Sequence, residues 1–434
     1  MVHFTVVHFG GIPPVLHSII MRALFLSAIA AAWVVVCATV AVADTAEVNL
    51  PSHFQHHRHE FESWWSSASS GPTTFGGGGS SSSGSGGSLG PSTFNGTGKG
   101  WHYYCEGNCL DNVNRRTQPG AILMGGGLDV GAAFKQQIKW SGGGDFLVLR
   151  SDLDPGYNDW IFTTLGGVNS VTTLVVYSKD GADSSFVVER VLQSEAIFIA
   201  GGNQWHYFEY WRNTRLELSL HTQKGVIPFG GTSAGCMVLP HWVFDAEFGG
   251  IVSSDALQNP TQQTVSAALT RGYLVPFPQL NRTLIDTHFV TRDRFGRLLT
   301  FMANLAQDDV RNVSTHRPIF GIGIDEHTAF AVDPYETTKA PAAMSDGPVV
   351  SSAHDPRPRR MATLLGNGTA YVLRVTHKAM DLSSNPLTMA AVEVQKLVAG
   401  DVFDFSTMTG GQPQNAYSVG AADGTLSQAD PYNP

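Results

Sequence analysis

Cysteine and positive charge are both scarce in this chain. Only four of its 434 residues are cysteine, and 27 Lys and Arg face 36 Asp and Glu, for a formal net charge of −9 at pH 7. The basic residues do not gather into a long stripe, so the field of the protein does not favour polyanions. We therefore expect neither nucleic acid nor an anionic membrane surface as the main partner.

The few cysteines also limit what the chain can bind. Cys105 and Cys109 are close enough in sequence to close a short disulfide loop in an oxidising compartment. Without a second pair they make a weak zinc site, and Cys236, in an apolar stretch, is expected to be a buried, inert thiol. Four histidines within residues 53–59 are interpreted as part of a surface segment or a processed pro-region. We therefore predict no metal site.

What the chain does have at its N-terminus is a long apolar run. Met21 and Arg22 precede an apolar stretch over residues 24–42, which ends in Ala-Val-Ala at Ala43. This order is typical of a secretory signal peptide, and it predicts secretion, cleavage near Ala43 and no membrane span in the mature protein. The alternative is a single membrane anchor, because the apolar run is close in length to the roughly 20 residues that a bilayer span needs. The start is either Met1 or Met21, and in the second case residues 1–20 are an upstream extension.

Composition divides the chain into four segments. We expect a signal region at 1–43, a disordered His-rich and Gly/Ser-rich segment at 44–100, an α/β domain at 101–410 with a surface insertion at about 334–360, and a loose tail at 411–434. Four Asn-x-Ser/Thr triplets are consistent with a secreted glycoprotein. The acceptors are Asn95, Asn281, Asn312 and Asn367.

Short apolar runs alternate with helical patterns from about residue 119 onward. The runs that we interpret as strands are 121–127, 145–151, 171–178, 196–202 and 225–231. This alternation predicts an α/β fold with a doubly wound, mostly parallel sheet and helices on both faces. Ligands bind at the carboxyl ends of strands in that architecture. The Gly-rich turns GGG, AGGN and GGTSAG, which follow three of these runs, should therefore meet on one rim.

One of these turns has the features of a nucleophile elbow. In VIPFGGTSAGCMVLP (226–240), small residues surround Ser233 where a strand should feed a helix. A serine nucleophile needs a base within hydrogen-bond reach. His288, in LIDTH, ends an apolar strand on the same predicted rim. The alternative for His288 is a core histidine with satisfied hydrogen bonds.

Arginines follow His288 closely. Arg292, Arg294 and Arg297 lie at the predicted start of a helix, where cations oppose the helix dipole. The guanidinium group suits bidentate capture of a carboxylate. We interpret Arg292 and Arg294 as candidate ligands for an acidic group of a substrate.

Four blocks together resemble the cyanophycinase family and its relatives, the aspartyl dipeptidases. They are GGNQ (201–204), GTSAG (231–235), DTHFVTRDRFGRL (286–298) and GIGIDEHTA (321–329). The resemblance spans roughly residues 119–410, and it implies a serine hydrolase on a scaffold similar to class I glutamine amidotransferases. It implies no metal or organic cofactor, and a homodimer as the default assembly.

The resemblance also implies roles for individual residues. Ser233 would be the nucleophile, His288 the base, and the backbone N–H groups of Gly202 and Ala234 the oxyanion hole. Thr287 stands where cyanophycinases usually have Gln, which leaves the substrate open. The residues at substrate-pocket positions are Gln204, Asp286, Thr287, Arg292, Arg294 and Arg297.

The acid that would orient the histidine is ambiguous in the sequence. The family places an Asp or Glu between the serine and the histidine, and the candidates are Asp245, Glu247 and Asp255. We prefer Asp255, because it precedes the block that leads to His288.

The functional hypothesis is a secreted serine peptidase that acts on peptide bonds involving aspartyl groups, with an acidic peptide as its partner. The alternative is a secreted binding protein that keeps the scaffold without turnover. A lipase-like esterase fits the charged pocket poorly.

Overall fold

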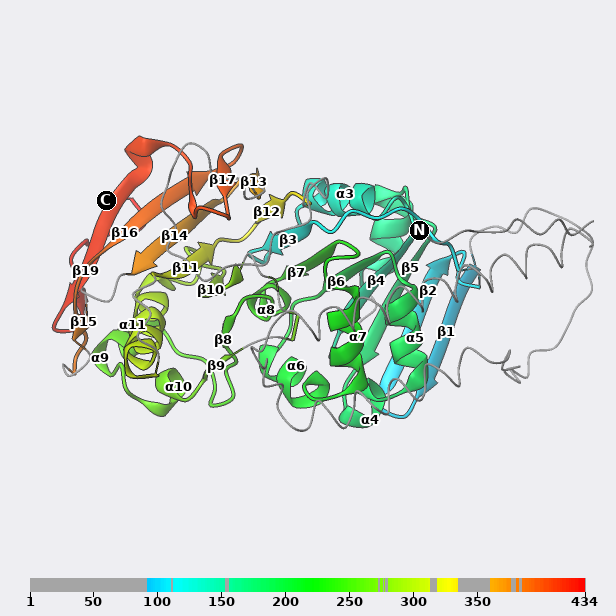
Figure 1. The fold of residues 1–434 in the computed structure, drawn as a ribbon, viewed down its shortest axis with the longest axis horizontal. Coiled ribbons are helices and arrows are strands. Elements are labelled where there is room, and N and C mark those ends of the chain that lie inside the picture. Colours follow the sequence, from blue (N-terminus) through cyan, green and yellow to red (C-terminus); the bar gives the residue numbers. More distant parts are fainter. Residues whose placement is uncertain are drawn as a thin grey trace, which may run out of the picture. The chain divides into compact units, whose positions relative to one another are not determined.

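The fold was analysed in a computed structural model, shown in Figure 1. The chain divides into two compact units, Met1–Ser70 and Gly71–Pro434, and every described residue lies in the second. The residues described are 92–110, 112–152, 156–271, 274–275, 277, 280–312, 318–334, 360–375, 380–381 and 385–433. The predicted signal peptide, Cys37, the histidine cluster, the side chain of Asn312 and nearly all of the predicted insertion lie outside this set.

The first of two sheets has a parallel centre. Within the described chain it has eleven strands in the order β1-β2-β5-β4-β6-β7-β3-β12-β13-β17-β18, and the pairs from β5 to β3 are all parallel. The strands are β1 (Ser92–Gly98), β2 (Trp101–Gly107), β3 (Ala121–Met124), β4 (Asp145–Arg150), β5 (Ser170–Val176), β6 (Ala196–Ile199), β7 (Phe229–Thr232), β12 (Thr328–Val332), β13 (Met361–Gly366), β17 (Val402–Asp404) and β18 (Thr409–Gly410).

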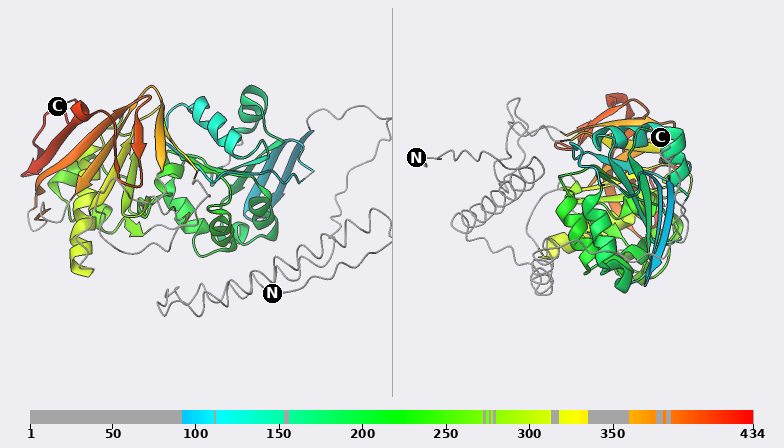
Figure 2. Two further views of the ribbon diagram at one scale, coloured as in Figure 1. Left: turned by 45° about the horizontal axis from the view of Figure 1, so that its top comes forward. Right: turned by 90° about the vertical axis from the view of Figure 1, so that its right-hand side faces the viewer.

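Helices cover both faces of this parallel centre, as Figures 1 and 2 show. The helices and helical turns of this region are α3 (Gly131–Trp140), η1 (Trp160–Leu165), α4 (Lys179–Ala182), α5 (Ser185–Gln193), α6 (Gln204–Trp211) and α7 (Arg215–Gln223). Side chains alternate along β4: Phe146 and Val148 pack in the cluster that contains α3, whereas Leu147 and Leu149 pack in the cluster that contains α5, α6 and α7. The strands are largely apolar because both of their faces are buried.

The second sheet is mainly antiparallel. Its path in the described chain is β20-β19-β16-β14-β11-β10-β8-β9, with β15 beside β16, and only β8, β10 and β11 run parallel to one another. The strands are β8 (Trp242–Phe244), β9 (Leu269–Arg271), β10 (Thr283–Thr287), β11 (Ile319–Ile324), β14 (Thr369–Val375), β15 (Met380–Asp381), β16 (Thr388–Val398), β19 (Ala416–Ala422) and β20 (Thr425–Leu426). The helices of this half are α8 (Ala234–Met237), α9 (Ser253–Gln258), α10 (Gln263–Ser266), α11 (Phe295–Asn312) and the short η4 (Pro413–Asn415).

The predicted α/β class is confirmed, and the sheet topology differs from the expected one. Hydrogen bonding divides the strands into two mixed sheets instead of one mostly parallel sheet. Some of the added antiparallel strands bury one face only; β16, for example, alternates between buried and exposed residues along much of its length. Such alternation is typical of antiparallel strands with one solvated face.

Two expected segment boundaries were wrong. The tail expected to be loose after residue 410 contains β19, which pairs with β16 through Val392 and Val419 and through Val394 and Tyr417. At the other end, β1 begins at Ser92, inside the segment expected to be disordered, and pairs with β2. Composition predicted these boundaries poorly because both strands are held by pairing with a neighbouring strand, which the composition of a segment does not show.

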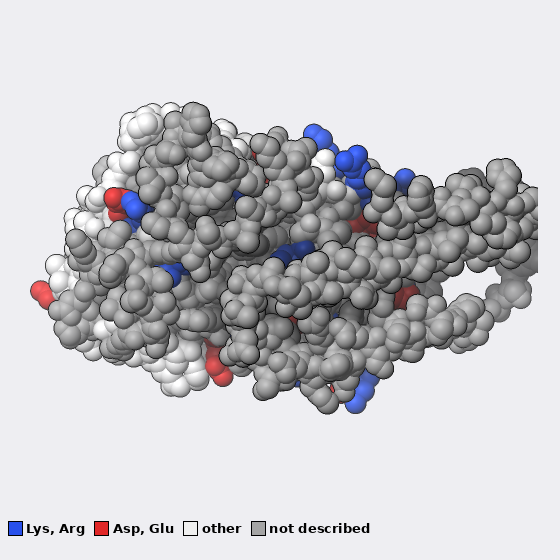
Figure 3. All heavy atoms as spheres, in the orientation of Figure 1, with Lys and Arg blue, Asp and Glu red and all other residues white. Residues whose placement is uncertain are grey.

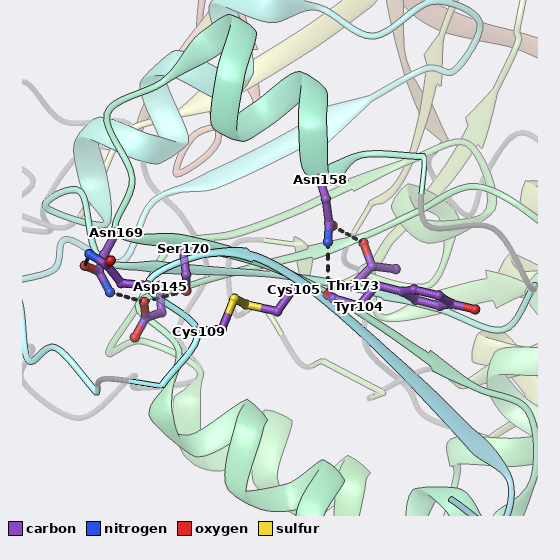
Figure 4. The surroundings of a disulfide bond; sticks show 9 residues. Tyr104, Cys105, Cys109, Asp145, Asn158, Asn169, Ser170 and Thr173 are labelled. Atoms are coloured by element: carbon purple, nitrogen blue, oxygen red, sulfur yellow. Dashed lines mark hydrogen bonds between the residues drawn. A yellow bond between two sulfur atoms is a disulfide. The ribbon is translucent and has the colours of Figure 1, made fainter. Parts of the chain in front are cut away.

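A disulfide joins Cys105, on β2 between β1 and β5 of the first sheet, to Cys109. Figure 4 shows its surroundings, where Asn158 bridges β2 and β5 by donating to the Tyr104 carbonyl at 3.0 Å and accepting from Thr173 at 2.6 Å. Cys236 is buried and unpaired, and burial raises the pKa of its thiol.

Two further features are the distribution of basic side chains on the surface and the character of the helices. On the face drawn in Figure 3, the visible Lys and Arg side chains of the described residues form small, separate groups. No helix in the described ranges combines the length and apolar character that a membrane crossing requires.

Candidate active site

Ser233 occupies a sharp turn between β7 and α8. Its backbone has φ 51° and ψ −123°, a conformation that L-residues rarely adopt and that costs about 1–3 kcal/mol. The residues two positions before and after Ser233 must be glycine: a Cβ at Gly231 would lie 2.4 Å from the Gly235 carbonyl oxygen, and one at Gly235 would lie 2.1 Å from the Ile199 carbonyl oxygen. The structure therefore has the elbow geometry that the sequence predicted around Ser233.

His288 reaches the serine from the other sheet. It follows β10 directly, and its N–H donates to the Gly125 carbonyl at 2.8 Å. Its Nε2 lies 2.7 Å from Ser233 Oγ. The ring passes against Gly126, where a Cβ would come within 2.5 Å of the imidazole. The GGG turn after β3 thus makes room for the histidine, and the structure brings Ser233 and His288 together.

Glu326, not Asp255, contacts the other imidazole nitrogen. Glu326 Oε1 lies 2.5 Å from His288 Nδ1. Asp255 is exposed on α9 and contacts the neighbouring Ser254 hydroxyl at 3.3 Å. Asp245 accepts from the Glu247 N–H at 2.9 Å, a local turn contact. None of the three candidates Asp245, Glu247 and Asp255 is the partner of His288, so the preference for Asp255 was wrong.

The pairing of β10 with β11 explains the position of Glu326. These strands are parallel, with Thr287 opposite Ile324, so residues just beyond the two strand ends meet on one rim. His288 is the first residue after β10 and Glu326 the second after β11. The signal was present in GIGIDEHTA: a second apolar strand ending in two carboxylates. It could be used only once that strand was paired with LIDT.

The surroundings keep the imidazole neutral. Burial is the largest cause that lowers the pKa of His288, and Arg292 and Arg294 lower it further, while the hydrogen bond and charge of Glu326 oppose them. A neutral imidazole whose Nδ1–H is held by a carboxylate presents Nε2 as an acceptor. This arrangement suits proton transfer from Ser233.

The two residues whose N–H groups the sequence assigns to an oxyanion hole both lie at the wall of one cavity. Gly202 and Ala234 both line the cavity that contains Ser233 and His288. Gly202 has φ 146°, and a Cβ there would lie 2.4 Å from Asp152 Oδ2. The preceding Gly201 passes close to the serine, since a Cβ there would be 3.3 Å from the Ser233 Cβ.

The cavity at the serine has a volume of about 250 Å³. Of the six predicted pocket residues, five line it: Gln204, Thr287, Arg292, Arg294 and Arg297. Gln204 is held by the Phe244 carbonyl at 3.3 Å. Thr287 is fully buried, and its Oγ1 has no hydrogen-bond partner among the described residues. Of these two side chains, Gln204 is therefore held by a hydrogen bond, whereas the Thr287 hydroxyl is held by none from the described residues.

Asp286 does not line the cavity and instead forms a buried ion pair beneath it. Arg297 donates Nε–H to Asp286 Oδ2 at 2.7 Å and Nη2–H to Oδ1 at 2.6 Å. The guanidinium also lies 5.3 Å from the Phe244 ring centroid and 5.9 Å from that of Phe301. Both side chains of the pair are at most 5% exposed. Arg297 is therefore committed to Asp286.

The other two arginines, Arg292 and Arg294, are less tightly paired with carboxylates than Arg297 is. Arg294 donates to the Thr287 carbonyl at 2.7 Å and reaches Asp286 at 3.4 Å, and burial lowers its pKa to about 10. Arg292 is exposed at the cavity wall and has no carboxylate partner among the described side chains. Three guanidinium groups against one carboxylate leave an excess of positive charge at this wall, which favours an anionic ligand.

The described residues contain no group of three His, Cys, Asp or Glu side chains arranged to hold a metal ion. The Ser233, His288 and Glu326 side chains form instead a continuous hydrogen-bonded series. A strand-to-helix elbow with such a series defines a serine-type hydrolase.

Comparison with known proteins agrees with this class. Residues 162–334 match the sequence model of peptidase family S51. The chain is 28% identical to the cyanophycinase of Geminocystis herdmanii over 235 residues, which are 51% of this chain and 77% of that protein. It is 30% identical to the cyanophycinase of Synechococcus elongatus over 174 residues, 40% of this chain and 46% of that protein. The chain is thus similar to peptidase family S51 over residues 162–334 and to cyanophycinases, which supports a serine-type peptidase.

The match covers less than half the length of the Synechococcus relative. Among solved structures, a peptidase from an acI-B1 Actinobacterium covers 67% of this chain and 98% of its own, at 18% identity and a TM-score of 0.37.

Proposed function

We propose that this protein hydrolyses peptide bonds that involve an aspartyl group, through an acyl-enzyme on Ser233. The observation that carries the proposal is the series of short contacts from Ser233 Oγ through His288 to Glu326, next to a wall with unpaired arginine charge. The cyanophycinase relatives support a β-Asp-Arg polymer or Asp-containing peptides as the substrate class.

In the acylation step, Ser233 Oγ attacks the carbonyl carbon while its proton moves to His288 Nε2. The negative charge that develops on the carbonyl oxygen is stabilised by the N–H groups of Gly202 and Ala234. His288 then gives the proton to the leaving nitrogen, the C–N bond breaks, and the amine departs. Glu326 stabilises the imidazolium that exists between these transfers.

Deacylation repeats the same transfers with water. His288 takes a proton from the water, whose oxygen attacks the acyl carbon of the ester. The bond to Ser233 Oγ breaks, and the proton on His288 returns to that oxygen. A carboxylic acid and the free serine result, and no cofactor is needed for either half.

The excess positive charge assigns a second carboxylate of the substrate to the arginine wall. Arg292 is exposed and has no carboxylate partner among the described residues, so it can form a charge-assisted hydrogen bond without breaking an ion pair with any of them. Arg294 supports it from a partly buried position. Thr287, smaller than the Gln usual in cyanophycinases, offers beside them a buried hydroxyl that no described residue hydrogen-bonds.

The test combines labelling with a substrate panel. A fluorophosphonate probe should label the purified protein, and Ser233→Ala should abolish labelling. We expect cleavage of β-Asp-Arg chains or α-Asp dipeptides and little turnover of a short-chain ester. A folded protein that neither labels nor cleaves these peptides would instead be the non-catalytic binding protein, and preferential ester turnover would indicate an esterase.

We also propose that the protein is secreted and glycosylated. The Cys105–Cys109 disulfide supports an oxidising compartment, and the acceptors Asn95, Asn281 and Asn367 are exposed. N-terminal sequencing of the mature protein should begin near Asp44, and glycosidase treatment should lower its apparent mass. Size-exclusion chromatography would test the default homodimer. A protein that starts at Met1 or Met21 and is unaffected by glycosidase would contradict the secretory route.

A further inference from the structure

The segment after β20 ends in a buried tyrosine that contacts the active-site loop. Tyr432 is 7% exposed, and its ring packs edge-on against Phe289 and Phe295, with both centroids at 5.8 Å. Its hydroxyl accepts the Phe295 N–H at 3.0 Å. The same oxygen lies 3.0 Å from Asp293 Oδ1 and 3.2 Å from the Phe289 carbonyl oxygen, so its single proton is donated to one of these two acceptors.

These contacts fall on the loop that joins β10 to α11. The loop begins with His288 and ends just before Phe295, and it carries Arg292 and Arg294 between them. Both His288 and Asp293 have left-handed backbones, with φ 48° and 46°. Such conformations persist only where surrounding contacts determine them.

The two halves of the loop have different main partners, although the Tyr432 hydroxyl also lies 3.2 Å from the Phe289 carbonyl oxygen in the His288 half. The His288 half is fixed by the Gly125 carbonyl, by Glu326 and by Asp325, which accepts the N–H groups of Val290 and Thr291 at 3.0 and 2.9 Å. The arginine half is fixed by the Ser253 hydroxyl, which donates to the Asp293 carbonyl, and by Tyr432. Losing Tyr432 should therefore loosen the arginines more than the histidine.

Tyr432 is itself anchored to the antiparallel part of the second sheet. Its carbonyl accepts from the Tyr371 hydroxyl on β14 at 3.2 Å and from Lys396 Nζ on β16 at 3.1 Å. Its N–H donates to Asp430 Oδ1 at 2.9 Å. Burial raises the pKa of Tyr432, so the hydroxyl keeps its proton and can donate. A rigid sheet thus presents a fixed hydroxyl to the loop.

We propose that Tyr432 is a positioning residue that holds Arg292 and Arg294 at the cavity wall and thereby sets affinity for the acidic group of the substrate. The proposal rests on the proposed function, because it assigns the arginines to that group. It does not place Tyr432 in the chemistry of Ser233, which the hydroxyl does not contact.

Tyr432→Phe tests the proposal, because it removes the hydroxyl and leaves the ring packing. One hydrogen bond of ordinary strength predicts a rise of about 5- to 10-fold in KM for an acidic peptide. We expect kcat and the rate of Ser233 labelling by an uncharged fluorophosphonate to stay within about twofold, given the separate anchors of His288.

Tyr417→Phe is the matched control. The Tyr417 hydroxyl donates to the Pro431 carbonyl at 2.7 Å, so this variant removes a hydroxyl contact to the same segment without touching the loop. Its KM should match wild type. Equal KM values in wild type and Tyr432→Phe would overturn the proposal, as would equal increases in the two variants.

Amide hydrogen exchange gives a readout that does not depend on turnover. In Tyr432→Phe the Phe295 amide should exchange faster, because it loses its acceptor, while the His288 amide stays protected by Gly125. Unchanged exchange at Phe295 would refute the proposal even if the wild-type protein proves inactive. An inactive wild type with the expected exchange pattern would refute only the proposed function. If Tyr432→Phe does not fold, Asp293→Ala removes the exposed partner of the same hydroxyl and should raise KM; an unchanged KM there contradicts the proposal.

Discussion

Replacing Glu326 by glutamine tests the hydrogen-bonded series at its least expected member. The change is nearly isosteric, but it replaces a carboxylate 2.5 Å from His288 Nδ1 with an amide. If the amide NH₂ faces the ring, it donates to Nδ1 and forces the proton onto Nε2, which then cannot accept the proton of Ser233. The equivalent loss in other serine triads lowers kcat by about 10⁴. We expect a loss of about 10³–10⁴ in kcat with little change in KM.

The pH profile gives the same prediction a second readout. His288 must be neutral to act as a base, so the rate falls as pH drops through its pKa. Glu326 is one of the groups that raise this pKa, whereas burial and the two arginines lower it. Removing the carboxylate leaves only the lowering influences. The acid limb of kcat/KM for Glu326→Gln should therefore move to lower pH than in wild type.

The assay is steady-state hydrolysis of an Asp-containing peptide by wild type, Glu326→Gln and Asp255→Asn. Asp255 is exposed on α9 and does not contact His288, so Asp255→Asn should keep kcat within about twofold. Retention of wild-type kcat by Glu326→Gln, or an equal loss in both variants, would refute the assignment of Glu326 as the orienting acid.

Three further changes separate binding, stability and geometry. Arg292→Ala should raise KM for an acidic peptide by about 10- to 100-fold, as expected for one charged hydrogen bond, with kcat nearly unchanged; equal KM values would contradict its role. Asp286→Asn leaves a buried guanidinium without its carboxylate and should destabilise the fold by about 3–5 kcal/mol in urea unfolding, whereas an unchanged midpoint would mean that the pair is not buried in solution. Gly126→Ala should abolish labelling without unfolding, since the added Cβ would lie 2.5 Å from the His288 ring; Gly225→Ala, also at positive φ but in open space, should label normally.

Local sequence patterns were sufficient to predict the elbow and the histidine at the rim. Small residues around Ser233 indicated a sharp turn, and an apolar strand ending at His288 indicated a position at its carboxyl end. Both inferences use features within a few residues of the side chain concerned. The structure brings these two residues together because both strand ends face the same rim.

Glu326 could not be predicted in the same way, because its position depends on which strands are neighbours. The family resemblance placed an acid between Ser233 and His288, and Asp255 was preferred because it precedes the block that leads to His288. The parallel register of Thr287 with Ile324 decides instead, and it joins residues that are nearly forty positions apart. The prediction of a loose tail after residue 410 was wrong for a similar reason, because Val419 and Tyr417 pair with residues of β16.

The three arginines near the start of α11 differ in how the electrostatic cost of their position is offset. All three lie at or just before the N-terminus of α11, where cations oppose the dipole. Asp286 offsets this cost at Arg297 through two short hydrogen bonds, so that arginine needs no ligand. Arg294 reaches the same carboxylate only at 3.4 Å, and Arg292 has no carboxylate partner among the described residues. The electrostatic cost that the protein leaves uncompensated is therefore concentrated at the two side chains that face the cavity, where an anionic substrate would remove it.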